Sequence, residues 1–172
     1  PGEEPPHYVT LREGSKSPND CFPQCNPGSY GVFGDRRGKC YQCPIGTFSS
    51  IVNAVSNESC SQCPVKYYNS FPGATQCSLC PPGQQCNTTG LPKGYDCAKG
   101  TYALNRGSEE CSQCPAGRYE SKPGEAQCSS CPGGKFNGRV GSFALGDCED
   151  CPDGTFASMN GSSQCLKCGK TE

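Results

Sequence analysis

One cysteine-led unit recurs about eight times along the chain, and it constrains the fold more than any other feature. In its clearest copy a leading cysteine opens Cys114-Pro-Ala-Gly-Arg-Tyr119, a second turn carries Gly124, and Cys128-Ser-Ser-Cys131 ends the unit. Repetition at a short period predicts an architecture in which each unit packs on its neighbours. The units span residues 25–40, 43–60, 63–77, 80–86, 97–111, 114–128, 131–148 and 151–165.

Two positions of the unit are nearly constant. Glycine stands three residues after the leading cysteine in seven of the eight units, and Lys66 is the exception. An aromatic residue stands five residues after it in seven of the eight, and the unit at Cys80 is the exception. Pro after the cysteine presets φ near about −65°, and Gly supplies the positive φ of a type II turn. The spacing therefore predicts a chain reversal directly after each leading cysteine.

A second turn follows in most units, and its glycine lies four residues before the next cysteine. Each unit is therefore predicted to be a short two-stranded hairpin closed at its base. Because an isolated hairpin is marginally stable in water, the units should stack end to end and bury their aromatic residues against neighbours. The expected fold is small and disulfide-rich, an elongated tandem array of two-stranded β-hairpins with little or no helix. The second-turn glycines are Gly73, Gly107, Gly124 and Gly161.

The composition supports cross-links in place of an apolar core. Leu, Ile, Val and Phe together fall well below the roughly 20% under which chains tend not to collapse, whereas 18 of the 172 residues are cysteine. A net charge of −1 argues against nucleic acid or an anionic membrane as a partner. No apolar run is long enough to span a bilayer. Because the sequence begins with Pro1, we expect a processed or excised piece of a longer protein.

Two segments depart from the repeat, and they set the predicted domain boundaries. Residues 1–20 lack cysteine and are predicted to form an N-terminal arm, either a solvated tail or a strand that pairs with an exposed edge of its own repeats or of a neighbour. Residues 87–96 are rich in turn formers and are predicted to be an insertion or joint after a five-residue loop, although that loop can equally be a smaller rung. The predicted blocks of repeats are 21–86 and 97–168, followed by a C-terminal end at 169–172. The predicted strand residues are His7, Tyr8, Val9, Thr10 and Leu11.

Seven Cys-x-x-Cys pairs allow three readings. A four-cysteine zinc site fits the spacing of Cys40-x-x-Cys43 and Cys60-x-x-Cys63. A redox motif fits less well, because it sits at a strand-to-helix junction and the chain shows no helical period. Disulfides are favoured over zinc, because the only histidine lies outside the repeats. Three Asn-x-Ser/Thr acceptors also indicate a secreted chain with N-linked glycans. We therefore expect no metal and no other cofactor. The predicted acceptors are Asn57, Asn87 and Asn160.

The pattern Cys-Pro-x-Gly-x-aromatic followed by Cys-x-x-Cys resembles the ephrin-receptor-like cysteine-rich repeat, and more distantly the modules of tumour necrosis factor receptors. The resemblance covers residues 21–168, with departures at Lys66 and in the short unit at Cys80. It implies that each leading cysteine bonds to the next cysteine along the chain. The implied pairs are Cys25–Cys40, Cys43–Cys60, Cys63–Cys77, Cys80–Cys86, Cys97–Cys111, Cys114–Cys128, Cys131–Cys148 and Cys151–Cys165.

This pairing leaves Cys21 and Cys168 over, one near each end. Either they bond to something outside the chain, or the register is crossed, with pairs such as Cys40–Cys60 and Cys43–Cys63. A third hypothesis is that they join successive subunits and lock a filament covalently.

No catalytic constellation accompanies these cysteines, so the chain is not expected to be an enzyme. The acidic pairs Glu109-Glu110 and Glu149-Asp150 are candidates for calcium, but solvated charge is the better interpretation. Two functions remain. The first is a secreted or cell-surface structural glycoprotein, a rod that assembles into or decorates a filament by self-association or with other extracellular proteins. The second is a ligand-binding or adhesive segment of a receptor ectodomain, for which the aromatic candidates are Tyr41, Tyr67, Phe71 and Tyr95.

Overall fold

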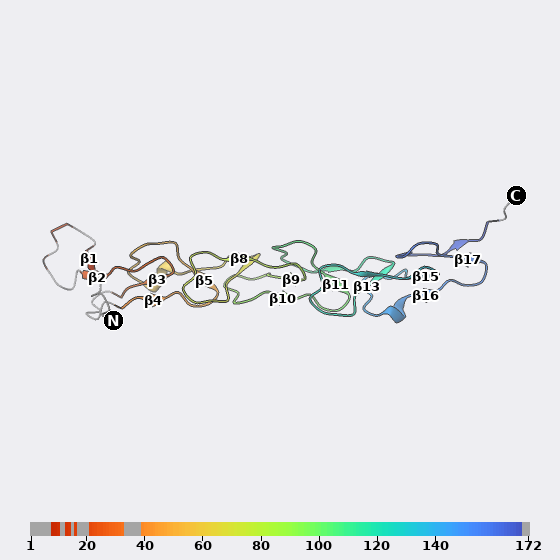
Figure 1. Cartoon of the computed structure of the whole chain (residues 1–172), viewed down its shortest axis with the longest axis horizontal. Coiled ribbons are helices and arrows are strands. Elements are labelled where there is room, and N and C mark those ends of the chain that lie inside the picture. The colour runs from red at the N-terminus through yellow and green to blue at the C-terminus, as the bar shows by residue number, and fades with distance from the viewer. Residues whose placement is uncertain (1–7, 11–12, 15, 17–20, 33–38, 170–172) are drawn as a thin grey trace, which may run out of the picture. The chain divides into compact units, whose positions relative to one another are not determined.

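The computed structural model describes residues 8–10, 13–14, 16, 21–32 and 39–169 (Figure 1). Their regular structure consists of antiparallel two-stranded pairs, each formed by strands that follow one another along the chain. Two 3₁₀ turns, η2 (Asn57–Ser59) and η3 (Leu145–Asp147), are the helical elements of this described part. The fold is therefore the predicted disulfide-rich tandem array of hairpins.

The strands are two or three residues long. They are β1 (Tyr8–Thr10), β2 (Cys21–Pro23), β3 (Ser29–Tyr30), β4 (Tyr41–Gln42), β5 (Thr47–Phe48), β6 (Ser61–Gln62), β7 (Tyr67–Tyr68), β8 (Ser78–Leu79), β9 (Gln84–Gln85), β10 (Tyr95–Asp96), β11 (Thr101–Tyr102), β12 (Ser112–Gln113), β13 (Arg118–Tyr119), β14 (Ser129–Ser130), β15 (Lys135–Phe136), β16 (Glu149–Asp150), β17 (Thr155–Phe156) and β18 (Leu166–Lys167).

We number the repeats 1 to 8 by their leading cysteines, which are Cys25, Cys43, Cys63, Cys80, Cys97, Cys114, Cys131 and Cys151. Repeat 6 illustrates the first turn: the N–H of Arg118 donates to the carbonyl of Pro115 at 3.1 Å, and Gly117 has a φ of 82°. Proline is thus the first residue of the turn rather than the second, and glycine is the third, the position that requires positive φ in a type II turn. The following strand pairs Tyr119 with Ser129.

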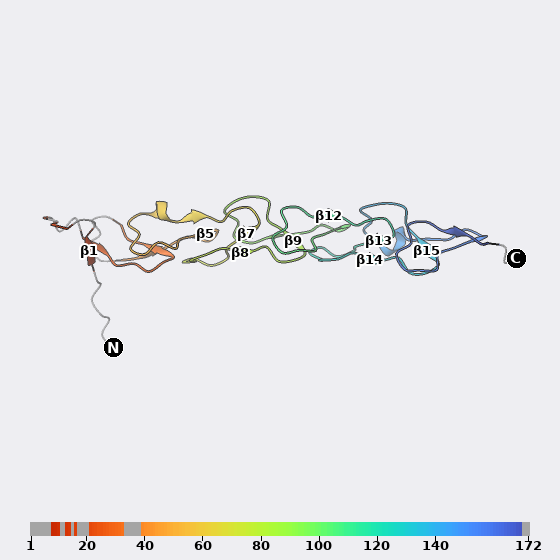
Figure 2. The same ribbon diagram turned by 90° about the horizontal axis from the view of Figure 1, so that it is seen from above.

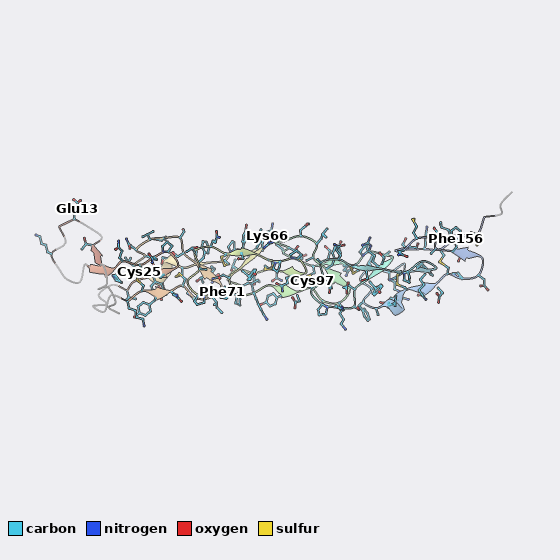
Figure 3. The ribbon with its side chains drawn as sticks, in the orientation of Figure 1. Glu13, Cys25, Lys66, Phe71, Cys97 and Phe156 are labelled. Carbon is cyan, nitrogen blue, oxygen red and sulfur yellow. A yellow bond between two sulfur atoms is a disulfide. The ribbon has the colours of Figure 1, made fainter. Side chains whose placement is uncertain are left out.

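Lys66 adopts the same conformation in repeat 3 without being glycine, with a φ of 79°. A side chain at such a φ costs about 1–2 kcal/mol, because its Cβ approaches the backbone carbonyl. The surrounding stack therefore holds the turn even where the sequence departs from the repeat pattern. Figure 3 labels Lys66 in this turn.

Sulfur forms most of the buried core. Cys43, Cys63, Cys97, Cys114 and other leading cysteines are at most 1% exposed, and few aliphatic side chains join them. The buried aliphatic residues are Ala54, Leu91, Ala103 and Ala157. Because so little apolar surface is buried, the cross-links must supply much of the stability, as the composition predicts.

Backbone hydrogen bonds join each repeat to the next. From repeat 5 to repeat 6, the N–H of Gly100 donates to the carbonyl of Glu120 at 2.8 Å, and the N–H of Gly124 donates to the carbonyl of Cys97 at 2.8 Å. The N–H of Ala103 also donates to the carbonyl of Glu125. The same three bonds recur between repeats 6 and 7 and between repeats 7 and 8. Each hairpin therefore satisfies backbone groups of its predecessor, which an isolated hairpin leaves to water.

Glycine is required where repeats two apart come together. A Cβ built on Gly117 would lie 2.0 Å from the carbonyl oxygen of Gly161, and one on Gly100 would lie 2.3 Å from that of Gly141. Both distances are far inside van der Waals contact. The glycine of the first turn thus provides close backbone packing as well as positive φ.

Repeat 4 is complete, in contrast to the predicted short loop and insertion. Its leading cysteine, Cys80, stands 17 residues before Cys97, the same distance that separates Cys97 from Cys114. Gly90 forms the second turn, with a φ of 71° and with its N–H donating to the carbonyl of Cys63 at 2.8 Å. Strands β9 and β10 pair in the usual register. Residues 87–96 are therefore the second half of a regular repeat.

The chain divides into two compact units, Pro1–Leu79 with Thr88–Lys93, and Cys80–Asn87 with Gly94–Glu172. Within the first unit β5 follows the hairpin β3–β4 (Figure 1), and within the second the hairpin β13–β14 follows β12 (Figure 2). The predicted division into two blocks of repeats, 21–86 and 97–168, remains a prediction.

Candidate glycosylation sites and interaction surfaces

Eight disulfides join each leading cysteine to the next cysteine along the chain. Seven of them span 14 to 17 residues, from Cys114–Cys128 to Cys43–Cys60, and Cys80–Cys86 spans six. These are the pairs that the family resemblance implies, and neither crossed pair forms. Within the described residues no group of three His, Cys, Asp or Glu side chains is placed to hold a metal ion.

The sixth position after the leading cysteine explains why repeat 4 differs. In repeats 3 and 7 this buried position holds Asn69 and Asn137. The Asn69 amide nitrogen donates to the carbonyls of Thr47 and Phe71, both at 2.8 Å. In repeat 4 the position holds Cys86, which is fully buried. The cysteine bonded to Cys80 therefore directly follows the first strand of the hairpin, β9. In repeat 6 the closing cysteine, Cys128, instead directly precedes the second strand, β14.

Gly94 stands where the other repeats carry the second cysteine. It follows the second-turn Gly90 by four residues, as Cys111 follows Gly107. A Cβ built on Gly94 would lie 2.7 Å from the sulfur of Cys80. The sequence contained a signal that glycine replaces the second cysteine here, because Gly90 precedes Cys97 by the same number of residues as Gly107 precedes Cys114.

Cys168 occupies the position of a further leading cysteine. Its N–H donates to the carbonyl of Gly154 at 2.9 Å, as the N–H of Cys131 donates to the carbonyl of Gly117. It is exposed and forms no disulfide. Its thiol is therefore accessible to a partner cysteine.

The N-terminal strand pairs within its own chain. β1 aligns Tyr8 with Pro23, Val9 with Phe22 and Thr10 with Cys21. Part of the strand predicted over residues 7–11 is thus observed. Of the two predicted partners, its own chain and a neighbouring one, it pairs with its own chain. His7 and Leu11 lie outside the described residues.

All three predicted glycan acceptors, Asn57, Asn87 and Asn160, are exposed. Asn57 begins the 3₁₀ turn η2, and the side-chain oxygen of Asn160 accepts a hydrogen bond from the N–H of Gly133 at 2.9 Å. Exposure is what an N-linked glycan requires.

The acidic pair in repeat 7 is engaged in ion pairs. Asp150 lies 2.7 Å from Lys135, and Glu149 lies 3.4 Å from Arg139. The first contact joins strands β15 and β16, and both carboxylates are solvent-exposed, where such pairs contribute at most about 1 kcal/mol. The alternative role of this pair in calcium binding finds no support in the geometry.

The four aromatic candidates lie in different surroundings. Tyr41 stacks on Tyr30, with ring centroids 5.9 Å apart, and Tyr67 is half-buried. Phe71 (Figure 3) and Tyr95 are 75% and 51% exposed. Sequence reasoning missed the exposed apolar residues of repeat 7, which include Phe143, because its longer second loop carries them outside the repeat positions.

A shallow groove of about 260 Å³ lies in the second compact unit. The side chains that line it include Tyr102, Leu104 and Arg118. One guanidinium nitrogen of Arg118 lies 3.5 Å from the carbonyl of Cys128. Aromatic residues and arginine are the types that most often anchor protein partners.

Comparison with known proteins finds a family match for one stretch of the chain. The helical elements among the described residues are too short to cross a membrane. A search of curated proteins finds no match to the chain. Residues 100–148 match the family described as tyrosine-protein kinase ephrin type A/B receptor-like, and this stretch therefore carries the ephrin-receptor-like repeat that the cysteine and glycine spacing predicted.

Proposed function

We propose that the chain is a non-enzymatic extracellular structural glycoprotein that assembles into, or decorates, a secreted or cell-surface filament. One observation carries the proposal: within each compact unit, successive repeats are joined by recurring backbone hydrogen bonds, such as those from Gly124 to Cys97 and from Gly141 to Cys114. A protein built by serial stacking extends by adding further copies of the same contact, as head-to-tail assemblies do.

Three features support the extracellular location. Eight disulfides persist in oxidising compartments and are rare where thiols are kept reduced. The acceptors Asn57, Asn87 and Asn160 are exposed. The match at residues 100–148 is to a receptor-like extracellular module.

In this proposal the glycans limit side-to-side association of the chains. Each hairpin is two strands wide, so any strand edge that a neighbouring repeat does not cover can pair with another chain, and a bulky glycan blocks such side-to-side pairing. Replacing Asn57, Asn87 and Asn160 together by Gln should increase lateral association and leave end-to-end association unchanged.

Particle imaging and sedimentation of the purified glycosylated protein test the proposal. We expect particles to lengthen by end-to-end addition as protein concentration rises. Monodisperse single chains at high concentration would contradict the structural function.

The groove that contains Tyr102, Leu104 and Arg118 favours a second function, the ligand-binding or adhesive segment of a receptor ectodomain. In that case labelled protein should bind a cell surface saturably, and Arg118→Ala should weaken binding by about tenfold or more. Arg106→Ala is the matched control, since Arg106 is an exposed arginine of the preceding repeat that does not line the groove. Equal effects of the two substitutions would reject the groove as a ligand site.

A further inference from the structure

Two of the repeats carry a longer second loop than the others. The disulfides of repeats 2 and 7 each span 17 residues, whereas the remaining spans are 6, 14 or 15 residues. We call residues 50–59 the repeat 2 loop and residues 138–147 the repeat 7 loop, which lies between β15 and β16 (Figure 1). Each ends in a 3₁₀ turn directly before the closing cysteine. The two loops therefore form a matched pair that differs in sequence.

One side of each loop is fixed against the preceding repeat. In repeat 7 the N–H of Gly141 donates to the carbonyl of Cys114 at 2.7 Å, and in repeat 2 the N–H of Asn53 donates to the carbonyl of Cys25 at 2.8 Å. The residue that follows each donor is at most 5% exposed. The preceding repeat therefore covers the inner side of both loops in the same way.

The outer side of the repeat 7 loop exposes three large apolar side chains. Val140, Phe143 and Leu145 are 63%, 59% and 52% exposed. Val52 holds the position of Val140 in repeat 2, and it is 60% exposed although repeat 3 and the second turn of repeat 4 follow it in the same compact unit. Repeats that follow along the chain therefore leave this side of the loop open.

The two loops differ in whether a glycan can cover them. Asn57, a predicted acceptor, begins the 3₁₀ turn of repeat 2, and Leu145 begins that of repeat 7. A glycan on Asn57 shields the neighbouring apolar side chains, which include Val52. The repeat 7 loop contains no asparagine, so its apolar side chains have no glycan of their own.

The exposed Phe143 is carried on a fixed backbone. The carboxylate of Asp147 accepts hydrogen bonds from the N–H of Phe143 at 3.0 Å and from that of Ala144 at 2.9 Å. The N–H of Asp147 donates in return to the carbonyl of Ala144 at 3.0 Å. Because this backbone is already ordered, a partner that binds Phe143 loses little conformational entropy there. Aromatic side chains are also enriched in protein interfaces.

Charges of both signs flank the apolar side chains. Arg139 lies 3.4 Å from Glu149, and their side chains are 76% and 60% exposed. An exposed pair at this distance is weak, so each member is able to pair with a group on another molecule. A two-fold contact requires a surface that is complementary to itself. This surface meets the requirement, because it offers an apolar centre, a cation and an anion, whereas a partner of one charge sign would be repelled by one of the two.

We propose that two copies of the chain pair through the repeat 7 loop in a two-fold contact. Val140, Phe143 and Leu145 form its centre, and Arg139 of each copy pairs with Glu149 of the other. The contact goes beyond the end-to-end assembly proposed above and does not depend on it. Because the surface is small, the pair belongs to the weak class of interfaces, and we expect a dissociation constant of about 10–100 μM.

The first test compares matched valines of the two loops. Sedimentation equilibrium is run on the glycosylated protein after N-ethylmaleimide has blocked free thiols, including Cys168, so that no disulfide-linked pair contributes. We expect Val140→Ser to weaken pairing at least about tenfold and Val52→Ser to leave it unchanged. Equal effects of the two substitutions, or a wild-type protein that does not pair at about 1 mM, would overturn the proposal.

The second test reverses the flanking charges. Arg139→Glu and Glu149→Arg should each weaken pairing by about tenfold, because each places like charges opposite one another in a two-fold contact. A mixture of the two variants forms pairs in which both charge contacts are between opposite signs. Energy transfer between differently labelled variants should therefore show tighter pairing in the mixture than in either variant alone. No gain on mixing would mean that the contact is not two-fold.

Phe143→Ser separates this inference from the filament function. If particles of this variant still add end to end while pairing is lost, the loop contact is confirmed as a separate one. If end-to-end addition is lost as well, the loop belongs to that contact and the separate pair is wrong. If end-to-end addition fails in the wild type but pairing through the loop occurs, the filament proposal falls and the pair stands.

A lipid surface is the alternative occupant of the same apolar side chains. Vesicles of phosphatidylcholine test it, because they offer apolar contact without net charge. We expect neither the wild-type protein nor Phe143→Ser to bind them. Binding by a wild-type protein that does not pair, together with its loss in Phe143→Ser, would assign the loop to lipid and overturn the pair.

Discussion

Repeats 4 and 6 have the same length and the same hairpin but close their disulfides at different places. Repeat 6 bonds Cys114 to Cys128, across a separation of 14 residues, and repeat 4 bonds Cys80 to Cys86, across six. Strands β9–β10 and β13–β14 nevertheless pair in the same register. The position of the second cysteine is therefore exchangeable, whereas the two turns and the backbone bonds between repeats are not. Turn geometry defines the repeat, and the disulfide stabilises it.

Removal of a disulfide should lower the stability of the chain strongly, and by more in repeat 6 than in repeat 4. In the chain-entropy model, closing a loop of roughly 15 residues stabilises by about 3 kcal/mol, and a loop of half that length by about 2.4 kcal/mol. We expect Cys114→Ala/Cys128→Ala to lower the free energy of unfolding by about 3 kcal/mol and Cys80→Ala/Cys86→Ala by somewhat less. Chemical denaturation under non-reducing conditions measures both. A larger loss in repeat 4 would contradict the comparison.

The next prediction separates the cost of a side chain at positive φ from the cost of opening the contact between repeats. Gly117→Ala places a Cβ 2.0 Å from the backbone of Gly161, but Gly154→Ala meets nothing within 4 Å, although both glycines have φ near 80°. Both substitutions carry the cost of positive φ, about 1–2 kcal/mol. Gly117→Ala should cost about 2 kcal/mol more, because the junction must open. Equal losses in thermal unfolding would show that the stacking contact contributes nothing.

Replacing Lys66 should have a smaller effect, and it should raise the free energy of unfolding. Its φ of 79° strains any residue with a Cβ, so Lys66→Gly should stabilise the chain by about 1 kcal/mol. Lys93→Gly is a control at an exposed position whose φ is not positive, and it should not stabilise. Destabilisation by Lys66→Gly would mean that the side chain contributes more than the backbone strain removes.

The smallest effect comes from converting repeat 4 to the pattern of repeat 6. In the variant Cys86→Ala/Gly94→Cys, the new sulfur starts from a Cβ 2.7 Å from the Cys80 sulfur, and alanine already fills the sixth position in repeats 5 and 8, as Ala103 and Ala157. We expect Cys80 to bond to the thiol introduced at position 94, with a gain of about 0.7 kcal/mol from the longer loop. Peptide mapping detects the bond. If the introduced thiol stays free, the two positions are not exchangeable.

The sequence was sufficient for the hairpin, the first turn and the burial of sulfur, because Cys, Pro and Gly restrict the backbone locally. It misled at repeat 4, because alignment by cysteines alone hid the second turn at Gly90. It did not reveal that Gly117 packs against Gly161, since this contact joins repeats two apart. Nor did it reveal the exposure of Phe143, because the longer loop of repeat 7 has no counterpart in the shorter repeats.

The most direct test of this account is disulfide mapping of the unreduced wild-type protein by mass spectrometry, after cleavage between Cys86 and Cys97. We expect Cys80 and Cys86 to be bonded within one peptide and Cys97 to be bonded to Cys111. A bond from Cys86 to Cys97, or free thiols that hold Zn²⁺, would contradict it.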